Sequence, residues 1–389
     1  MSKITLNSKN LKEAIAKLNG FIGETIVLEL TKQVSEAGTL AKLKACNGVA
    51  QAVAMITYGG DAVEEKLIFT NQLNTVVDAL SAFGETLTFE LLEGKTKVSS
   101  GTAVADVSYA TECKEIDAPN FQEVPTAVIG LTKEQFQRAV LEGGYINEKV
   151  PQLAYSQTCL LQAVVGEGDK PFLKVFSSSG QAYAESVVPV GINPKEIEVF
   201  KAFAGNPPVV VKSGPLLTIA KSLKSDIAMY LTQKFVFLVT ASEAYSFLPV
   251  AAQTGSVDKI LNTRFNKDFS AELSKEKVLN AFKVVGLSAD SSSNDGMFAN
   301  VTITEQEGGK VAVLVADING VNSVTFTGEG TGNKQMALRK SEVIRALDNM
   351  SGDKVTIYGN TAHTFIFLNG DNPNAFGFNV TVDLNEVKK

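Results

Sequence analysis

Apolar positions along the chain repeat in one order: a strand pattern, a short amphipathic helix pattern, and two or three further strand patterns. Strict alternation predicts the strands, and apolar residues three and four positions apart predict the helices. The helix patterns begin near six residues of the 389-residue chain: Ser8, Asn71, Lys133, Gly214, Ser274 and Lys340. One unit that recurs six times indicates an architecture built from repeats.

The starts of the helix patterns carry local signals as well as periodicity. Leu11 and Ile15 lie on one apolar face of the first pattern, and Ser8 is its expected N-cap. Thr132 and Gln135 bracket the start of the third pattern and fit a capping box, in which each side chain accepts a backbone hydrogen bond. These signals predict helices that begin at defined residues.

Spacing between the helix patterns divides the chain. Successive starts are 63, 62, 81, 60 and 66 residues apart, and the long interval contains an extra stretch, 191–206, that we interpret as an insertion. Two aperiodic segments, 111–127 and 252–267, indicate linkers. We therefore predict three similar α+β domains, each with two helices packed on antiparallel sheets and two of the six units. Their expected bounds are residues 1–122, 123–262 and 263–389.

Composition narrows the class of protein. The chain has one histidine, His363, which leaves almost no room for Ser/His/Asp or Cys/His chemistry. Its three cysteines lack metal-ligand spacing and are expected to be reduced thiols: Cys46, Cys113 and Cys159. No apolar run reaches membrane-spanning length, and the amino terminus lacks a signal-peptide core. We expect a cytoplasmic protein that is not an enzyme, with no metal and no cofactor.

Charge is distributed unevenly between the helices and the rest of the chain. The net charge is −6, yet the six helix patterns hold twelve Lys or Arg against seven Asp or Glu. They thus carry +5 and leave −11 for the remainder. Basic helices on an acidic body indicate one positive surface suited to phosphate contacts without base recognition, although a merely solvated face remains an alternative. The cations are Lys9, Lys12, Lys17, Lys133, Arg138, Lys221, Lys224, Lys275, Lys277, Lys283, Lys340 and Arg345.

Three stretches, in this order and with the sixfold spacing, resemble the bacterial β-type DNA sliding clamp, the DNA polymerase III beta subunit. The first is SSGTAVADVSYA with the downstream APNF (Ala118–Phe121), the second FLKVFSSSGQAYAESVVP (Phe172–Pro189), and the third KVAVLVADINGVNSVTF. The resemblance covers nearly the whole chain. In its departures from the usual pattern the chain resembles a divergent member of the family, such as a bacteriophage version. The resemblance implies the DNA clamp fold and a processivity factor without catalytic activity.

Further expectations follow from this resemblance alone. Two protomers would close head to tail into a ring around duplex DNA, with the basic helices facing the DNA without sequence specificity. DNA polymerase and clamp loader would bind through short peptides in an apolar pocket between the second and third domains, with walls formed by Ser178, Gly180, Tyr183, Val257, Ile260, Phe378 and Val380. The homodimer interface would join the edge strand that holds Val107 to the end of the fifth helix near Leu287. A β-rich structural or assembly protein built of repeated modules is the alternative.

Overall fold

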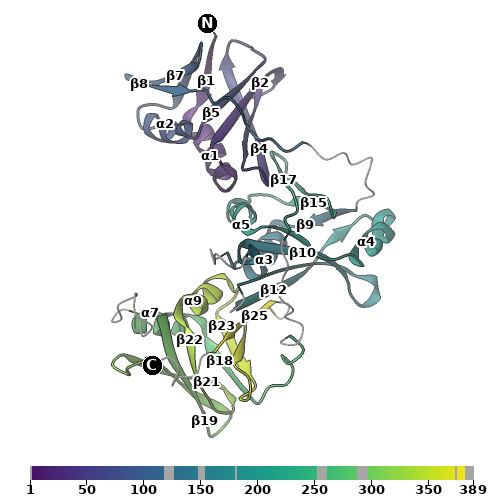
Figure 1. Ribbon diagram of the computed structural model, residues 1–389, viewed down its shortest axis with the longest axis vertical. Helices are drawn as coiled ribbons and strands as arrows, with labels where there is room; N and C mark the ends of the chain where they lie inside the picture. Colours follow the sequence, from purple (N-terminus) through teal and green to yellow (C-terminus); the bar gives the residue numbers. More distant parts are fainter. Residues whose placement is uncertain are drawn as a thin grey trace. The chain divides into compact units, whose positions relative to one another are not determined.

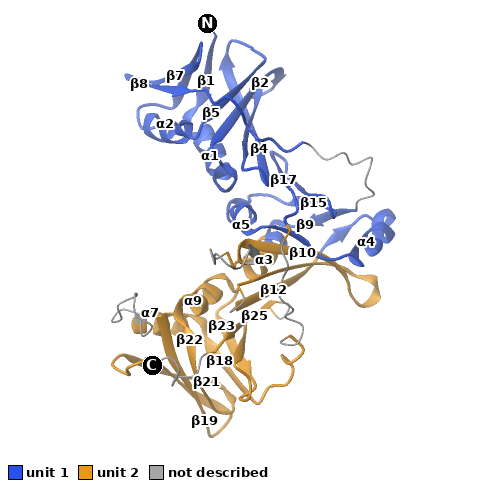
Figure 2. Ribbon diagram, in the orientation of Figure 1, with its two compact units in different colours: residues 1–136, 190–250 blue, residues 137–189, 251–389 orange. Residues whose placement is uncertain are grey.

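The computed structural model describes residues 2–117, 127–147, 154–179, 182–251, 261–286, 297–372 and 375–381, with the side chains of 154, 155 and 378 excepted. By contacts it divides into two compact units, residues 1–136 with 190–250 and residues 137–189 with 251–389 (Figure 2). Within the described residues no helix is long and apolar enough to cross a membrane.

Residues 3–108 contain two successive repeats of the predicted unit (Figure 1). The first consists of β1 (Lys3–Asn7), α1 (Ser8–Leu18), η1 (Asn19–Phe21), β2 (Thr25–Ser35), β3 (Gly38–Cys46) and β4 (Ala50–Gly60). The second consists of β5 (Glu65–Thr70), α2 (Gln72–Leu80), β6 (Thr86–Leu92), β7 (Lys95–Ser100) and β8 (Ala103–Ser108).

The middle of the chain repeats the order with additions. Its first half has β9 (Val128–Leu131), α3 (Lys133–Gly143), η2 (Ala154–Gln157), β10 (Thr158–Val165), η3 (Glu167–Asp169), β11 (Pro171–Ser178) and β12 (Ala182–Pro189). The predicted insertion forms β13 (Gly191–Ile192), η4 (Pro194–Glu196) and an additional helix, α4 (Ile197–Ala204). The second half has β14 (Val209–Lys212), α5 (Ser213–Ser222), β15 (Ile227–Leu231), β16 (Val236–Val239) and β17 (Glu243–Phe247).

The last two repeats occupy residues 269–380. One consists of β18 (Phe269–Ser274), α7 (Lys275–Gly286), β19 (Phe298–Gln306), β20 (Lys310–Asp317) and β21 (Ser323–Thr331). The other consists of β22 (Lys334–Arg339), α9 (Lys340–Asn349), β23 (Lys354–Gly359), β24 (Phe365–Asn369) and β25 (Ala375–Val380). The six predicted helices are confirmed, with starts at or within one residue of those expected.

Sheet pairing explains why there are two compact units. In the first unit an antiparallel path runs β13-β9-β15-β16-β17-β4-β1-β6-β7-β8, because β17 pairs with β4 through Glu243↔Ala54 to Phe247↔Ala50. In the second unit the path includes β10-β11-β12-β25-β24-β23-β18-β21-β20-β19-β22, because β25 pairs with β12. The first pairing joins one half of the predicted middle domain to the predicted first domain, and the second joins the other half to the predicted third domain. The bounds of the three domains stay a prediction.

Apolar faces of the helices pack on these sheets. Leu11, Ala14, Ile15 and Leu18 of α1 are buried, and α1 contacts β3 and β4. In the second unit the core includes residues from α7 and α9 together with strands β18 to β24. The polar faces of the helices are thereby directed away from the sheets, as amphipathic patterning requires.

Local signals at the helix starts are confirmed in one case and wrong in another. The capping box of α3 is confirmed, because Thr132 N donates to Gln135 Oε1 at 2.8 Å and Gln135 N donates to Thr132 Oγ1 at 3.2 Å. Ser8 is not the N-cap of α1. Asn7 takes that position and accepts from Asn10 N at 3.0 Å, while the Ser8 hydroxyl donates to Gly84 O.

Candidate functional site

The predicted cations of the first unit fall into two groups. Lys9 and Lys221 are exposed on α1 and α5 with no carboxylate within ion-pair distance among the described residues. Lys12, Lys17 and Lys224 are paired instead, to Asp78 at 3.0 Å, to Glu243, and to Glu13 at 3.4 Å. Lys133 is half-buried at the start of α3. Positive charge free for a ligand is therefore concentrated on fewer residues than the sequence suggests.

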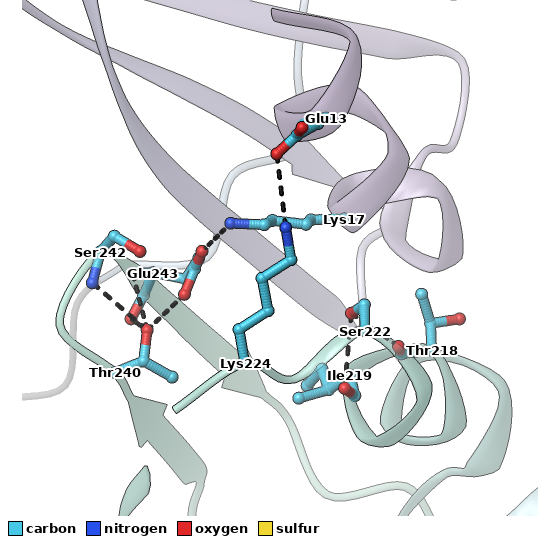
Figure 3. A network of polar contacts seen from close by, with 9 residues as sticks. All are labelled: Glu13, Lys17, Thr218, Ile219, Ser222, Lys224, Thr240, Ser242 and Glu243. Atoms are coloured by element: carbon cyan, nitrogen blue, oxygen red, sulfur yellow. Dashed lines mark hydrogen bonds and ion pairs between the residues drawn. The ribbon is translucent and has the colours of Figure 1, made fainter. Parts of the chain in front are cut away.

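Two of these ion pairs join α1 to strands and loops of the predicted middle domain (Figure 3). Lys17 donates to the Glu243 carboxylate, which also accepts a hydrogen bond from the Thr240 hydroxyl. Lys224 donates to the carboxylate of Glu13, which lies one turn before Lys17 on α1. Burial alone raises the pKa of Glu243, but hydrogen bonds from Lys17, Thr240 and Ser242 outweigh it and hold that pKa below its usual value. Lys17 is thus engaged within the protein.

Cations of the second unit show the same division. Arg138, Lys277 and Lys283 are exposed on α3 and α7. Lys275 donates through Nζ to Met350 O at 2.8 Å, and Arg345 of α9 is half-buried.

Lys340 does not fit the predicted DNA-facing role. Its residue is only 7% exposed, and its Nζ is buried with no hydrogen-bond partner in the described part of the chain. Burial lowers the pKa of Lys340, and the charge of Asp317 offsets this only in part. The sequence pattern did not predict this burial. Lys340 is the first residue of α9 and comes directly after β22, whose last residues are largely buried.

An aromatic stripe crosses one face of the second unit's sheet, defined here as Phe176, Tyr183, Phe376, Phe367 and Tyr358. These rings come from β11, β12, β25, β24 and β23, and neighbouring ring centroids lie 5.4–6.3 Å apart. Because the side chains of a strand alternate, Ile357 and Leu368 on the same strands point to the opposite face and join the helix-side core. The stripe therefore forms a small aromatic core on the face of the sheet remote from the helices, with Tyr183, Phe367 and Phe376 buried and Phe176 and Tyr358 half-buried at its ends.

The stripe lies on the strands where the peptide pocket was expected, but the predicted residues have different places. Tyr183 is 1% exposed and its hydroxyl donates to Glu185 at 2.5 Å, so it lies beneath the surface rather than in a pocket wall. Ser178 is buried and Val380 is half-buried. Gly180, Val257 and Ile260 lie outside the described residues, and of Phe378 only the backbone pairing with Tyr183 and Phe367 is described.

Sequence reasoning missed the other rings and the arginine above them. Arg264 lies 4.6 Å from the Phe376 ring centroid and 4.5 Å from that of Phe265. A usable signal was present, because aromatic residues alternate at Phe365 and Phe367. Two rings at that spacing on one strand share a face.

The predicted interface residues are also corrected in part. Strand β8 is the end of its sheet path, as expected for an edge strand. Val107, however, is fully buried and faces the core, whereas Val104 on the same strand is 54% exposed. Leu287 lies outside the described residues; Val284, three positions earlier on α7, is exposed.

Comparison with known proteins gives a fold but no sequence family. No family model matches the chain, and no curated protein matches its sequence. Among solved structures, the DNA polymerase III beta subunit from Thermotoga maritima is similar, with 12% identity over 98% of this chain and 100% of that chain and a TM-score of 0.76. A sliding clamp from Bartonella birtlesii is similar at 11% identity over 98% and 99%, with a TM-score of 0.75. The DNA polymerase III beta subunit from Pseudomonas aeruginosa is similar at 12% identity over 98% and 99%, with a TM-score of 0.72. The chain therefore has the DNA clamp fold.

Proposed function

We propose that the protein is a DNA sliding clamp, a processivity factor that encircles duplex DNA as a homodimeric ring and has no catalytic activity. The fold supports this reading over its whole length, and it explains why cations gather on helices while the remainder of the chain is acidic. A ring that slides needs phosphate contacts that are weak and independent of sequence. The alternative, a structural or assembly protein, gives no reason for that charge distribution.

The observation that carries the proposal is a sheet pairing used twice within the chain. Strand β4 pairs with β1 only at Gly59 and Gly60. Its residues 50–54 pair with β17 instead. Strand β12 likewise takes β25 along residues 182–186. In both cases the last strand of one predicted domain extends the first half of the preceding domain.

The third instance of this pairing is incomplete. Strand β21 corresponds to β4 and β12 in chain order, and it pairs with β18 only through residues 329–331. Strand β8 corresponds to β17 and β25, and its named ladder partner is β7 alone. Neither strand has a further ladder partner among the described residues of its own unit, so both keep an open edge. A second copy, placed head to tail, would pair both edges and remove two aggregation-prone strand edges.

DNA would be held by the exposed cations that have no ion-pair partner within the described ranges, which are Lys9, Arg138, Lys221, Lys277 and Lys283. The three paired lysines of the first unit, Lys12, Lys17 and Lys224, would add to the positive electrostatic potential around the DNA. Their ammonium groups are engaged by carboxylates and would not donate freely to phosphate. DNA polymerase and clamp loader would dock through short peptides at the half-buried ends of the aromatic stripe, Phe176 and Tyr358, where side chains of both predicted domains meet in one sheet. We place the protein in the cytoplasm.

Negative-stain electron microscopy with native mass spectrometry tests the ring directly. We expect a particle with a central hole at about twice 41.4 kDa. A compact particle or a filament without a hole would contradict the clamp and favour the structural alternative. Monomers that stay open at all concentrations would contradict the homodimer.

Retention on circular DNA tests the basic helices. Lys221→Glu with Lys277→Glu should lower retention and weaken its dependence on salt, by about 0.9 in the log–log slope for each phosphate that is no longer neutralised. Lys170→Glu with Lys310→Glu makes the same charge change at exposed lysines outside the helices and should leave retention near wild type. Equal losses in both double variants would mean that net charge, not the helix surface, holds the DNA.

A further inference from the structure

The segment 110–117, which comes shortly after β8, brings one cysteine over the strand that carries another. Cys46 is the last residue of β3 and lies opposite Gln51 of β4. Residues opposite each other in an antiparallel pair have their side chains on the same face of the sheet. The Gln51 side chain holds the segment, because Ile116 N donates to its Oε1 at 2.8 Å and its Nε2 donates to Ile116 O at 3.1 Å. Cys113 is thus three residues from a backbone contact made beside Cys46.

A second contact fixes the side of the segment on which Cys113 lies. The Glu115 carboxylate is 3.4 Å from Lys44 Nζ, and Lys44 is two positions before Cys46 on β3, so these two side chains share a face. Cys113 and Glu115 are half-buried, whereas Lys114 between them is exposed. The Cys113 side chain is therefore directed at the sheet together with that of Glu115.

The thiols are close enough for the charge of one to act on the other. Burial raises the pKa of the Cys46 thiol, the Gly48 amide offsets this in part, and the charge of Cys113 raises it further. The charge of Cys113 also acts on Lys66, whose pKa is raised first of all by its hydrogen bond to Glu115. Cys113 thus lies between β5, which carries Lys66, and the end of β3.

A cavity gives small molecules access to this place. Its volume is about 520 Å³, and it is lined by Cys46 and by the two neighbours of Cys113, Glu112 and Lys114. Cys113 is half-buried, but Cys46 is only 5% exposed. An oxidant from solvent therefore reaches Cys113 more readily. An accessible thiol beside a second thiol that can resolve it is the arrangement of redox-sensing cysteines.

We propose that Cys46 and Cys113 form a reversible disulfide under oxidising conditions and that this bond fastens the segment 110–117 to β3. With oxidised glutathione, the Cys113 thiolate attacks one sulfur of the oxidant, and a mixed disulfide forms as the first glutathione leaves. The Cys46 sulfur then attacks the Cys113 sulfur and releases the second glutathione. The two cysteines lose two electrons and two protons in total, and the oxidant takes up both and leaves as two thiols.

The disulfide would restrain the chain where it leaves the edge strand β8. Ala110 N donates to Ile68 O at 2.7 Å, and Ile116 is held by Gln51, so hydrogen bonds connect both ends of the segment to the sheet. A covalent bond between them would oppose any opening of the segment. In a reducing compartment such a bond is transient, which suits a switch that responds to oxidation.

Peptide mapping of the full-length protein tests the inference. Reduced protein is incubated with millimolar oxidised glutathione, then unfolded, alkylated and digested. We expect the number of free thiols to fall from three to one, with Cys46 and Cys113 recovered in one cross-linked peptide. Cys159 is an internal control that should stay free, because it is fully buried and its burial raises its pKa. A disulfide joins Cα atoms about 4.4–6.8 Å apart, so the cross-link also reports how closely the segment approaches β3.

Serine variants separate the two steps. Cys46→Ser should retain one glutathionyl group on Cys113, because the thiol that resolves the mixed disulfide is missing. Cys113→Ser should leave Cys46 unmodified, since its thiol is buried. Cys159→Ser is the matched control and should form the same cross-linked peptide as wild type.

Hydrogen exchange measures whether the bond fastens the segment. In oxidised wild type the Ala110 and Ile116 amides should exchange more slowly by about tenfold or more, because a cross-link limits the open conformations of the segment. Dithiothreitol should restore the original rates. Amides between β19 and β20, in the other compact unit, should not change.

Several outcomes would overturn the inference. A mixed disulfide that persists on Cys113 in wild type would place Cys46 out of its reach. Three free thiols after oxidation, or a disulfide between the Cys113 residues of two chains, would exclude the pair. A cross-link that leaves the exchange of Ala110 and Ile116 unchanged would refute the fastening. The presence or absence of rings in electron microscopy decides the clamp separately from each of these results.

Discussion

The ion pair between Lys17 and Glu243 is predicted to stabilise the contact between α1 and β17, the strand that pairs with β4 in the first unit's sheet. We would replace Lys17 by Met, which keeps most of the side chain's length and removes its charge, and Glu243 by Gln, which keeps its shape. The double variant completes a thermodynamic cycle that isolates the pair from each residue's other contacts.

Burial sets the expected size of the effect. The Glu243 side chain is only 10% exposed, so Lys17→Met leaves a largely desolvated carboxylate with the side chains of Thr240 and Ser242 as its remaining donors. Removing one partner of a fully buried pair costs about 3–5 kcal/mol, and for this partly buried pair we expect about 2 kcal/mol. Glu243→Gln should cost about 1 kcal/mol, since Lys17 can extend its ammonium toward water. The coupling energy should be about 1 kcal/mol.

Native-state hydrogen exchange measures the opening of this junction without assuming that the whole chain unfolds in one step. The reporter amides are those of the β4–β17 ladder and Met55 N, which donates to Ser242 O at 3.1 Å. A loss of about 2 kcal/mol corresponds to exchange faster by about thirtyfold. Amides between β6 and β7 should keep their wild-type rates.

Lys224→Met with Glu13→Gln provides the matched control. The Lys224 side chain is 71% exposed, so its pair should contribute little, at most about 0.5 kcal/mol. Because the folded-state pKa of Glu243 is lowered, the pair's stabilisation is present above the unfolded-state value of about 4.3 and is lost as pH falls through the folded-state value. Additive single variants, or an effect that persists unchanged in acid, would refute the reasoning.

Two further substitutions test packing and ring closure. Gly143→Ala should lower the unfolding free energy of the second unit by about 1–3 kcal/mol in urea titration, because an added Cβ would lie 2.2 Å from Val175 O; Gly205→Ala, where the nearest atom is 3.7 Å away, should have little effect. Val104→Lys should shift the protein from dimer to monomer in analytical ultracentrifugation, whereas Val34→Lys, at a strand position that is 73% exposed against 54% for Val104, should leave the dimer intact. A dimer that tolerates Val104→Lys would exclude β8 from the interface.

Periodicity was sufficient to predict the fold class and all six helices, because each helix has one apolar face that the sheets must cover. The edge position of β8 was expected from the family resemblance and not from periodicity. Periodicity was insufficient for α4, since a short helix within an insertion has no counterpart elsewhere in the chain.

The candidate sites were less predictable because they depend on partners distant in sequence. Lys17 looks like a solvent-facing cation until Glu243, 226 positions away, is placed beside it. Tyr183 looks like a pocket residue until the rings of Phe176 and Phe376 enclose it. Lys340 looks exposed by its charge, but its place in the first turn of α9 buries it. Residue type and periodicity do not contain these relations.

The tenth residue of the first helix in each predicted domain shows how one architecture accommodates different chemistry. In α1 it is Lys17, which pairs with Glu243. In α3 it is Glu142, whose carboxylate accepts from Asn372 Nδ2 at 2.6 Å. In α7 it is Val284, which is exposed and apolar. The first two positions are satisfied inside the chain by the residues that precede or begin β17 and β25.

The counterpart for Val284 would come from the second protomer. The elements equivalent to β17 and its preceding helix are β8 and α2, and both present exposed apolar side chains, Val104 on β8 and Phe83 just after α2. Exposed apolar residues at matching places are best explained by mutual burial. The contact between protomers would therefore combine strand pairing with exposed apolar side chains, while the two internal junctions combine strand pairing with a buried polar contact at this helix position. Such a difference would let the proposed ring open between protomers while the junctions within each protomer stay closed.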